Sequence, residues 1–72
     1  MLPGEIDGRR FLRAMARLGW RVVKQRGSHR TLQKAGSGQI LIVAFHETLS
    51  RNSVRRALRE AGVPEEEFEG RL

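Results

Sequence analysis

The sequence predicts a single α+β domain over residues 1–72, in which a three-stranded antiparallel sheet carries two helices on one face. Three observations predict this fold. The chain opens with an apolar face at helical spacing, continues with three strand-like runs joined by short turns, and closes with a second helical face. The expected order is therefore α-β-β-β-α, followed by a short helical turn at the C-terminus.

The first helix is expected from Gly8 to Leu18. Asp7 is a suitable N-cap residue, because its carboxylate can accept hydrogen bonds from the first free backbone N–H groups. Phe11 and Met15, four residues apart, lie on one apolar face, which Leu18 continues at the end of the helix. Gly19 follows directly and is typical of a helix C-terminus.

Three strands are expected next, at Trp20–Gln25, Ser28–Lys34 and Gln39–Phe45, since these runs are rich in β-branched and apolar residues. The turns between them fall at Arg26-Gly27 and at Ala35–Gly38. Such short connections imply an antiparallel meander. The register of the first hairpin stays open, because two-residue and three-residue loops place different side chains on the covered face.

A second helix is expected at about Ser53–Ala61, after a connection at His46–Arg51. Asn52 or Ser53 can cap its N-terminus, and Gly62 ends it. Apolar residues recur along it at helical spacing, which predicts one buried face. The basic residues expected to point away from that face are Arg55, Arg56 and Arg59.

The charge of the chain is unevenly distributed. The formal net charge is +6, yet residues 1–36 hold nine basic and two acidic residues, whereas residues 37–72 hold five and six. A basic half on a small domain indicates a polyanionic partner. Twelve of the fourteen basic residues are arginine, which binds phosphate through paired hydrogen bonds and stacks on bases.

Composition also excludes several classes of protein. The chain has no cysteine, so it has neither a disulfide framework nor a thiolate zinc site. Its longest apolar run, Ile40–Phe45, is far shorter than the roughly 20 residues that span a bilayer. The N-terminal residues contain no apolar stretch typical of a signal peptide. We therefore expect a cytoplasmic protein that does not associate with membranes.

His29 follows a Gly-Ser pair inside a basic segment, QRGSHRTLQK. RNA carries its own nucleophile, the 2′-hydroxyl, so cleavage requires a base for that proton, an acid for the leaving 5′-oxygen, and positive charge near the phosphate. An imidazole can perform either proton transfer near neutral pH. The nearby side chains of Lys24, Arg26 and Arg30 can neutralise the phosphate. The alternative interpretation is a strand histidine that makes one local hydrogen bond.

The adjoining turn and the second histidine also have two interpretations each. Gly27 permits a positive φ and lets a phosphate approach the backbone, and Ser28 can donate a hydrogen bond, but both are also common turn residues. His46 is a second proton-transfer group or a phosphate contact, or it packs locally at a strand end. His29 and His46 have no third potential ligand in register, so we expect no metal and no cofactor.

The order of four short motifs resembles that of one protein family. These motifs are LGWRVVKQ, RGSHRTL, ILIVAFHETL and ALREAGVPEEEF, and together they cover nearly the whole chain. In this order and spacing they resemble the HicA toxin family. The resemblance implies a fold like a double-stranded-RNA-binding domain, an endoribonuclease that cuts mRNA and blocks translation, and a HicB-type antitoxin as partner. It also implies that His29, in the Gly-Ser-His motif, is the active-site residue.

Two positions depart from the pattern of that family. A second polar or histidine residue often follows Gly-Ser-His, and here that residue is Arg30. The proline usual in the Val-Pro-x-His segment is replaced by Ala44. The first departure can change the contact with substrate, and the second changes the path into the following loop.

The sequence thus supports three hypotheses. The first is a metal-independent mRNA endoribonuclease, and the second is a non-catalytic RNA-binding module of the same fold. The third, a regulator that binds DNA, is weak because no helix-turn-helix spacing is present. With His29 as the catalytic residue, the residues predicted to bind RNA are Lys24, Arg26, Gly27, Ser28, Arg30 and His46.

Overall fold

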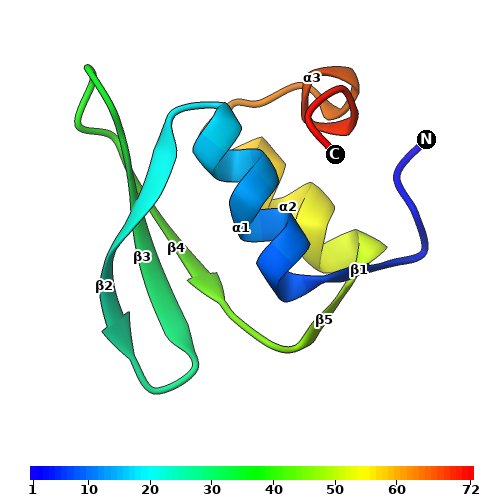
Figure 1. The fold of residues 1–72 in the computed structure, drawn as a ribbon, viewed down its shortest axis with the longest axis horizontal. Helices are drawn as coiled ribbons and strands as arrows, with labels where there is room; N and C mark the ends of the chain where they lie inside the picture. The colour runs from blue at the N-terminus through cyan, green and yellow to red at the C-terminus, as the bar shows by residue number, and fades with distance from the viewer.

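The computed structural model describes all 72 residues, and Figure 1 shows their arrangement. In chain order the elements are β1 (Glu5–Asp7), α1 (Gly8–Arg17), β2 (Trp20–Arg26), β3 (His29–Lys34), β4 (Ile40–Ala44), β5 (Thr48–Ser50), α2 (Arg51–Ala61) and α3 (Glu65–Glu69). Strands β2, β3 and β4 form an antiparallel sheet in that order, and β1 pairs with β5 in a second, small sheet. The predicted α+β class and the α-β-β-β-α order are confirmed.

Helix α1 begins where its N-cap residue predicts. The carboxylate of Asp7 accepts hydrogen bonds from the backbone N–H groups of Arg9, at 2.8 Å, and Arg10, at 3.3 Å. This satisfies two of the four free N–H groups of the first turn. Phe11 and Met15 are buried, as their spacing predicts. The cap therefore places the start of α1 against the segment that follows β4.

The first hairpin has a two-residue loop, which resolves the register that the sequence leaves open. Arg26 lies opposite His29, so Gly27 and Ser28 form the turn. Gly27 has a φ of 57°, and a positive φ at the first loop position is what a type II′ hairpin turn requires. The register shifts at Val23, where β2 carries one extra residue. This bulge is the reason that simple alternation does not give a clean pattern along β2.

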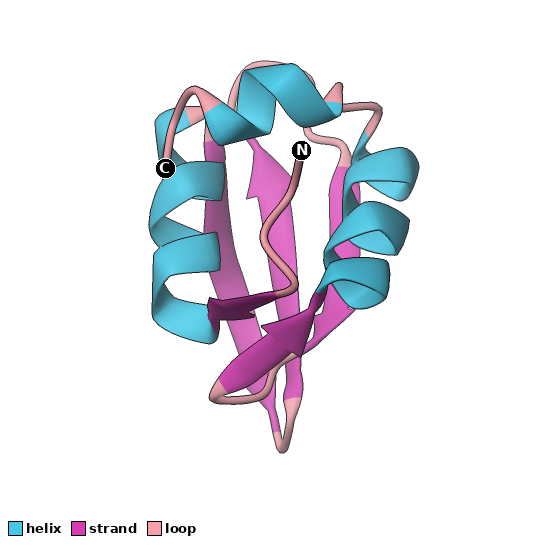
Figure 2. Ribbon diagram, turned by 90° about the vertical axis from the view of Figure 1, so that its right-hand side faces the viewer, coloured by secondary structure: helices cyan, strands magenta, loops and turns pink.

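Both long helices cover the same face of the sheet, with α1 over β2 and α2 over β4 (Figure 2). The core lies between these layers, and its aromatic rings include Phe11 and Phe68, whose centroids are 5.6 Å apart. The buried residues of the core are Leu2, Ile6, Phe11, Ala14, Met15, Trp20, Leu32, Leu41, Val43, Leu49, Val54, Ala57, Leu58, Ala61 and Phe68. The other face of the sheet is uncovered, and Ile40 and Ile42 are exposed there. Val23, the extra residue of β2, is exposed as well.

Two predictions about the segment before α2 are wrong. The connection expected at His46–Arg51 contains strand β5, which pairs with β1. The N-cap of α2 is Ser50, not Asn52 or Ser53, and its hydroxyl oxygen accepts a hydrogen bond from the N–H of Ser53 at 3.1 Å. The helix therefore starts earlier than predicted, directly after β5.

The C-terminal turn forms a third helix, α3, whose Phe68 is buried against the core. Two ion pairs hold this end of the chain. Arg55 of α2 pairs with Glu65, and the N-terminal amino group pairs with Glu69. None of the helices combines the length and the apolar composition that crossing a membrane requires.

Candidate active site

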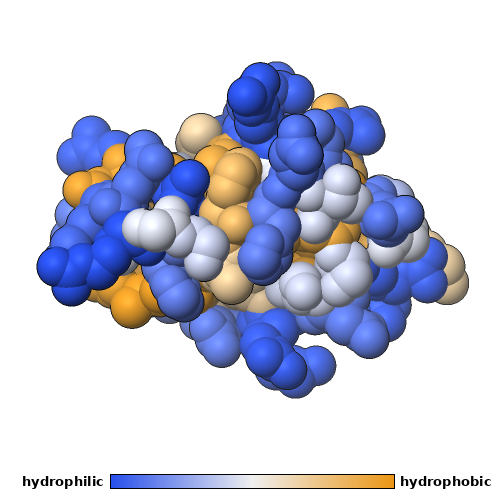
Figure 3. All heavy atoms as spheres, turned by 90° about the horizontal axis from the view of Figure 1, so that it is seen from below, coloured by the Kyte–Doolittle hydropathy of each residue, from blue (hydrophilic) through white to orange (hydrophobic).

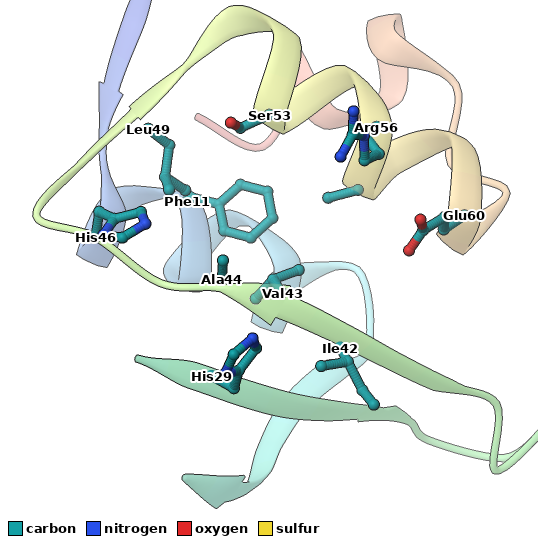
Figure 4. Close-up of a pocket in the computed structure, with 11 residues that line it drawn as sticks. Phe11, His29, Ile42, Val43, Ala44, His46, Leu49, Ser53, Arg56 and Glu60 are labelled. Carbon is teal, nitrogen blue, oxygen red and sulfur yellow. The ribbon is translucent and has the colours of Figure 1, made fainter. Parts of the chain in front are cut away.

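A pocket of about 360 Å³ lies along the free edge of β4, beneath α2 (Figure 4). Side chains from both faces of β4 line it, which places it at the edge of the sheet and not within the core. We call it the β4–α2 pocket. Its lining residues are Phe11, His29, Ile42, Val43, Ala44, His46, Leu49, Ser53, Arg56, Ala57 and Glu60.

His29 is the first residue of β3 and is exposed. It lies between Arg26 on β2 and Ala44 on β4 in the paired strands. Its side chain belongs to the uncovered face of the sheet, because Leu32, three residues further along β3, is buried on the helix side. Figure 4 shows the imidazole turned toward β4. The residue predicted to be catalytic is therefore open to solvent and reaches the β4–α2 pocket.

Two of the predicted cations lie on the same uncovered face as His29. Arg26 is directly opposite it, and Lys24 is opposite Thr31, two residues further along β3. Paired residues in an antiparallel sheet point to the same side, so Lys24, Arg26 and His29 share one face. Both cations are exposed, and the ion pairs of the molecule lie elsewhere. Their charge is thus available to a bound anion.

Arg30 lies on the opposite side of the sheet from His29. It pairs with Val43, which is buried beneath the helices. Its guanidinium donates hydrogen bonds to the carbonyl oxygens of Gly27, at 2.8 Å, and His29, at 3.3 Å, and lies 4.7 Å from the ring centroid of Phe45. These contacts tie the turn to the body of the sheet. The predicted contact between Arg30 and RNA stays a prediction, and the structure gives this residue a role in holding the hairpin.

His46 follows β4 and lines the same pocket as His29, so both histidines border one open space. Gly8 fixes the position of the His46 segment. Its backbone N–H donates a hydrogen bond to the carbonyl oxygen of Glu47 at 2.8 Å. A Cβ at position 8 would overlap the carbonyl oxygen of His46 and lie 2.8 Å from the ring of Phe45. Position 8 therefore requires glycine, a requirement that the sequence pattern alone did not reveal.

Helix α2 supplies three polar residues to the pocket that the sequence analysis did not include. Ser53, Arg56 and Glu60 line it, and their spacing places them on one stripe of the helix. The sequence predicts that Arg56 points away from the apolar face, and it is indeed exposed. What the sequence could not show is that this stripe overhangs the edge of β4 beside His29.

The backbone of β4 adds hydrogen-bond donors to the pocket wall. The N–H of Phe45 donates to the carbonyl oxygen of Ser28. The backbone N–H groups of Phe45 and of alternate residues before it therefore point toward β3. The N–H groups of Ile42 and Ala44 must then point to the free edge. Because β4 is an edge strand with no further strand beside it, these N–H groups are open to a ligand.

The arrangement can hold an anion and transfer a proton. It combines two histidines, free cations on β2 and α2, and free backbone N–H groups in one open, polar region. Viewed from the end of the molecule that carries the β2–β3 turn, hydrophilic side chains cover most of the surface and apolar atoms show between them (Figure 3). No three histidine, aspartate or glutamate side chains gather in a group that could hold a metal ion.

An α-β-β-β-α chain with a three-stranded antiparallel sheet has the architecture of domains that resemble double-stranded-RNA-binding domains. The profile of one family, described as "HicA toxin of bacterial toxin-antitoxin", matches residues 8–63. The chain therefore belongs to the HicA toxin family: it is a toxin of a toxin–antitoxin system, which implies an antitoxin as its partner. A comparison with curated proteins gave no match. Every residue that lines the β4–α2 pocket lies within the matched range.

Proposed function

We propose that this protein is an endoribonuclease that cleaves mRNA, and so blocks translation, with His29 as the proton-transfer residue. The observation that carries the proposal is the position of His29, which is exposed, paired with Arg26 across the hairpin, and part of the wall of an open pocket. Membership in a family of toxins that are generally ribonucleases supports it.

The proposed reaction uses the 2′-hydroxyl of RNA as the nucleophile. The neutral imidazole of His29 accepts the 2′-hydroxyl proton while the 2′-oxygen bonds to phosphorus. The bond between phosphorus and the 5′-oxygen breaks, and a second group protonates that leaving oxygen. His46 is the candidate for this second group, since it lines the same pocket. The products are a 2′,3′-cyclic phosphate and a 5′-hydroxyl end.

Phosphate binding is proposed for the cations and the turn beside His29. Lys24 and Arg26 lie on the same face as the imidazole and stabilise the charge that develops on the phosphate. At Gly27 a phosphate can approach the backbone closely, because no side chain is present and no atom lies within 4 Å of its Cβ position. The exposed hydroxyl of Ser28 can donate a hydrogen bond to the same group.

Two partners follow from this proposal. One is mRNA, bound through its phosphates across the basic, uncovered face of the sheet. The other is an antitoxin of the HicB type, which would block cleavage by covering this face. Its apolar contacts there would be Ile40 and Ile42, which are exposed on that face.

Replacement of His29 tests the proposal directly. We expect His29→Ala to abolish cleavage of single-stranded RNA in EDTA by purified protein, and to relieve growth arrest on expression. Thr31→Ala is the matched control, because Thr31 lies on the same strand and face. Unchanged cleavage by His29→Ala would refute the catalytic role. A wild-type protein that binds RNA and never cuts it would instead support the alternative, a non-catalytic RNA-binding module of the same fold.

A further inference from the structure

We propose that Arg56 of α2 binds the phosphate group that is cleaved at His29, so that the RNA strand lies in the β4–α2 pocket. The inference rests on the proposed ribonuclease function and assigns a substrate-binding residue to it. It also extends the path of the strand from the uncovered face of the sheet, past His29, to the edge of β4 beneath α2.

Arg56 lies on the wall of the β4–α2 pocket. Arg56 is the one residue among the fourteen lysines and arginines that lines the β4–α2 pocket. Figure 4 shows its guanidinium on the side of α2 that faces the pocket, between Ser53 and Glu60 along the helix. The cation and the imidazole of His29 therefore border the same space from two different elements.

The side chain of Arg56 has no partner within the protein. Arg51 and Arg55 of α2 are occupied: Arg51 donates to the carbonyl oxygen of Leu2 at 2.9 Å, and Arg55 pairs with Glu65 at 3.1 Å. Arg59 is unpaired like Arg56, but it does not line the pocket. Arg56 makes no hydrogen bond to another group and no ion pair, not even with Glu60 one turn further on. Its five N–H donors are thus free for a ligand.

The wall of the pocket opposite Arg56 carries further hydrogen-bond donors. The N–H groups of Ile42 and Ala44 point to the free edge of β4, and both residues line the pocket. Guanidinium and backbone N–H groups are among the donors that bind phosphate oxygens in proteins. A phosphate in this pocket therefore meets donors from α2 and from β4.

Charge on both sides of His29 fits the proposed reaction. Lys24 and Arg26 lie on β2, on one side of β3, whereas Arg56 approaches from beyond β4, on the other side. The non-bridging oxygens of the phosphate gain negative charge as the 2′-oxygen attacks. A guanidinium that contacts them lowers the free energy of the transition state more than that of the bound substrate.

The test compares Arg56→Gln with Arg59→Gln, an exposed arginine on the same helix that does not line the pocket. We expect Arg56→Gln to lower kcat/KM for single-stranded RNA by about tenfold to 100-fold, with Arg59→Gln close to wild type. Arg56→Lys keeps the charge but loses paired hydrogen bonds, so it should recover part of the loss. Circular dichroism and thermal unfolding establish that each variant is folded.

A second readout does not depend on cleavage. Binding of a non-cleavable 2′-O-methyl RNA is measured over a range of salt concentrations. Loss of one phosphate contact should reduce the slope of log K against log salt by about 0.7 for Arg56→Gln, and should leave it unchanged for Arg59→Gln.

The outcomes separate the inference from the proposed function. If His29→Ala abolishes cleavage while Arg56→Gln cleaves and binds like Arg59→Gln, the inference on Arg56 is wrong and the ribonuclease function stands. If the wild-type protein does not cleave RNA, the proposed function fails. The slope of log K against log salt then still shows whether Arg56 contacts a phosphate. Equal slopes for Arg56→Gln and Arg59→Gln would mean that it does not.

Discussion

His29 and Ala44 lie directly opposite each other in the β3–β4 ladder. Because the side chain of Ala44 is a single methyl group, the imidazole can extend across β4 and reach the pocket beneath α2. The same alanine presents its free backbone N–H to that pocket. His29 thus becomes part of the β4–α2 pocket because Ala44, its neighbour on β4, has a small side chain.

A larger side chain at position 44 should close this route. We expect Ala44→Leu to reduce RNA cleavage at least tenfold, because the added carbons occupy the space between the imidazole and α2. Folding should be retained, since Ala44 is exposed. Ala16→Leu is the control, an exposed alanine on α1 outside the pocket. Wild-type cleavage rates for Ala44→Leu would show that the imidazole does not act across β4.

Gly8→Ala tests how the His46 segment is held. The added methyl group would overlap the carbonyl oxygen of His46, and we expect a loss of about 1–3 kcal/mol in the free energy of unfolding. Gly4→Ala is the matched control, because no atom lies within 4 Å of its Cβ position. Urea unfolding of both variants gives the comparison, and equal stability for the two would rule out the close approach at Gly8.

Arg30 and Arg26 should differ in what they contribute to stability. Arg30→Ala removes a hydrogen bond to Gly27 and the contact with Phe45, so we expect a loss of about 1–2 kcal/mol. Arg26→Ala removes an exposed side chain and should change stability by less than about 0.5 kcal/mol. Urea unfolding of each variant measures these values. The opposite order would mean that the guanidinium of Arg30 does not hold the hairpin.

Glu60 places a carboxylate at the end of the β4–α2 pocket remote from His46 (Figure 4). A phosphate strand in the pocket would be repelled there, so Glu60→Gln should tighten RNA binding by about twofold to fivefold at low salt. Glu67→Gln on α3 is the control, an exposed acid outside the pocket. Fluorescence anisotropy with a non-cleavable RNA gives both affinities. Weaker or unchanged binding by Glu60→Gln would place the strand elsewhere.

Local signals in the sequence predicted the main elements. The Asp7 cap, the apolar spacing of α1 and α2, and the glycine turns each depend on neighbouring residues, and they gave the right α-β-β-β-α order. Strands β1 and β5 were missed because three-residue strands carry too little alternation, and their pairing joins distant segments of the chain. The cap of α2 was misplaced because Ser50, Asn52 and Ser53 are all suitable residues.

The candidate site was predictable in part. The Gly-Ser-His motif pointed to His29, and the local charge pointed to Lys24 and Arg26, which the fold places on the same face. The position of Arg56 depends on how α2 packs over β4, and helical periodicity gives the direction of a side chain only relative to its own helix. His29 and Arg30 are adjacent in one strand, so their side chains point to opposite faces of the sheet. Which of the two lies on the covered face could be known only from the register of the strands.

The chemical structure of the cleaved RNA ends shows whether the 2′-oxygen is the nucleophile. RNA is digested with the wild-type protein, and the ends are identified by mass spectrometry. Attack by the 2′-oxygen, with His29 and a second group transferring protons, predicts 2′,3′-cyclic phosphate and 5′-hydroxyl ends, and no cut where the attacking nucleotide is 2′-deoxy. Fragments with 3′-hydroxyl and 5′-phosphate ends, or cleavage at the deoxy position, would contradict the account.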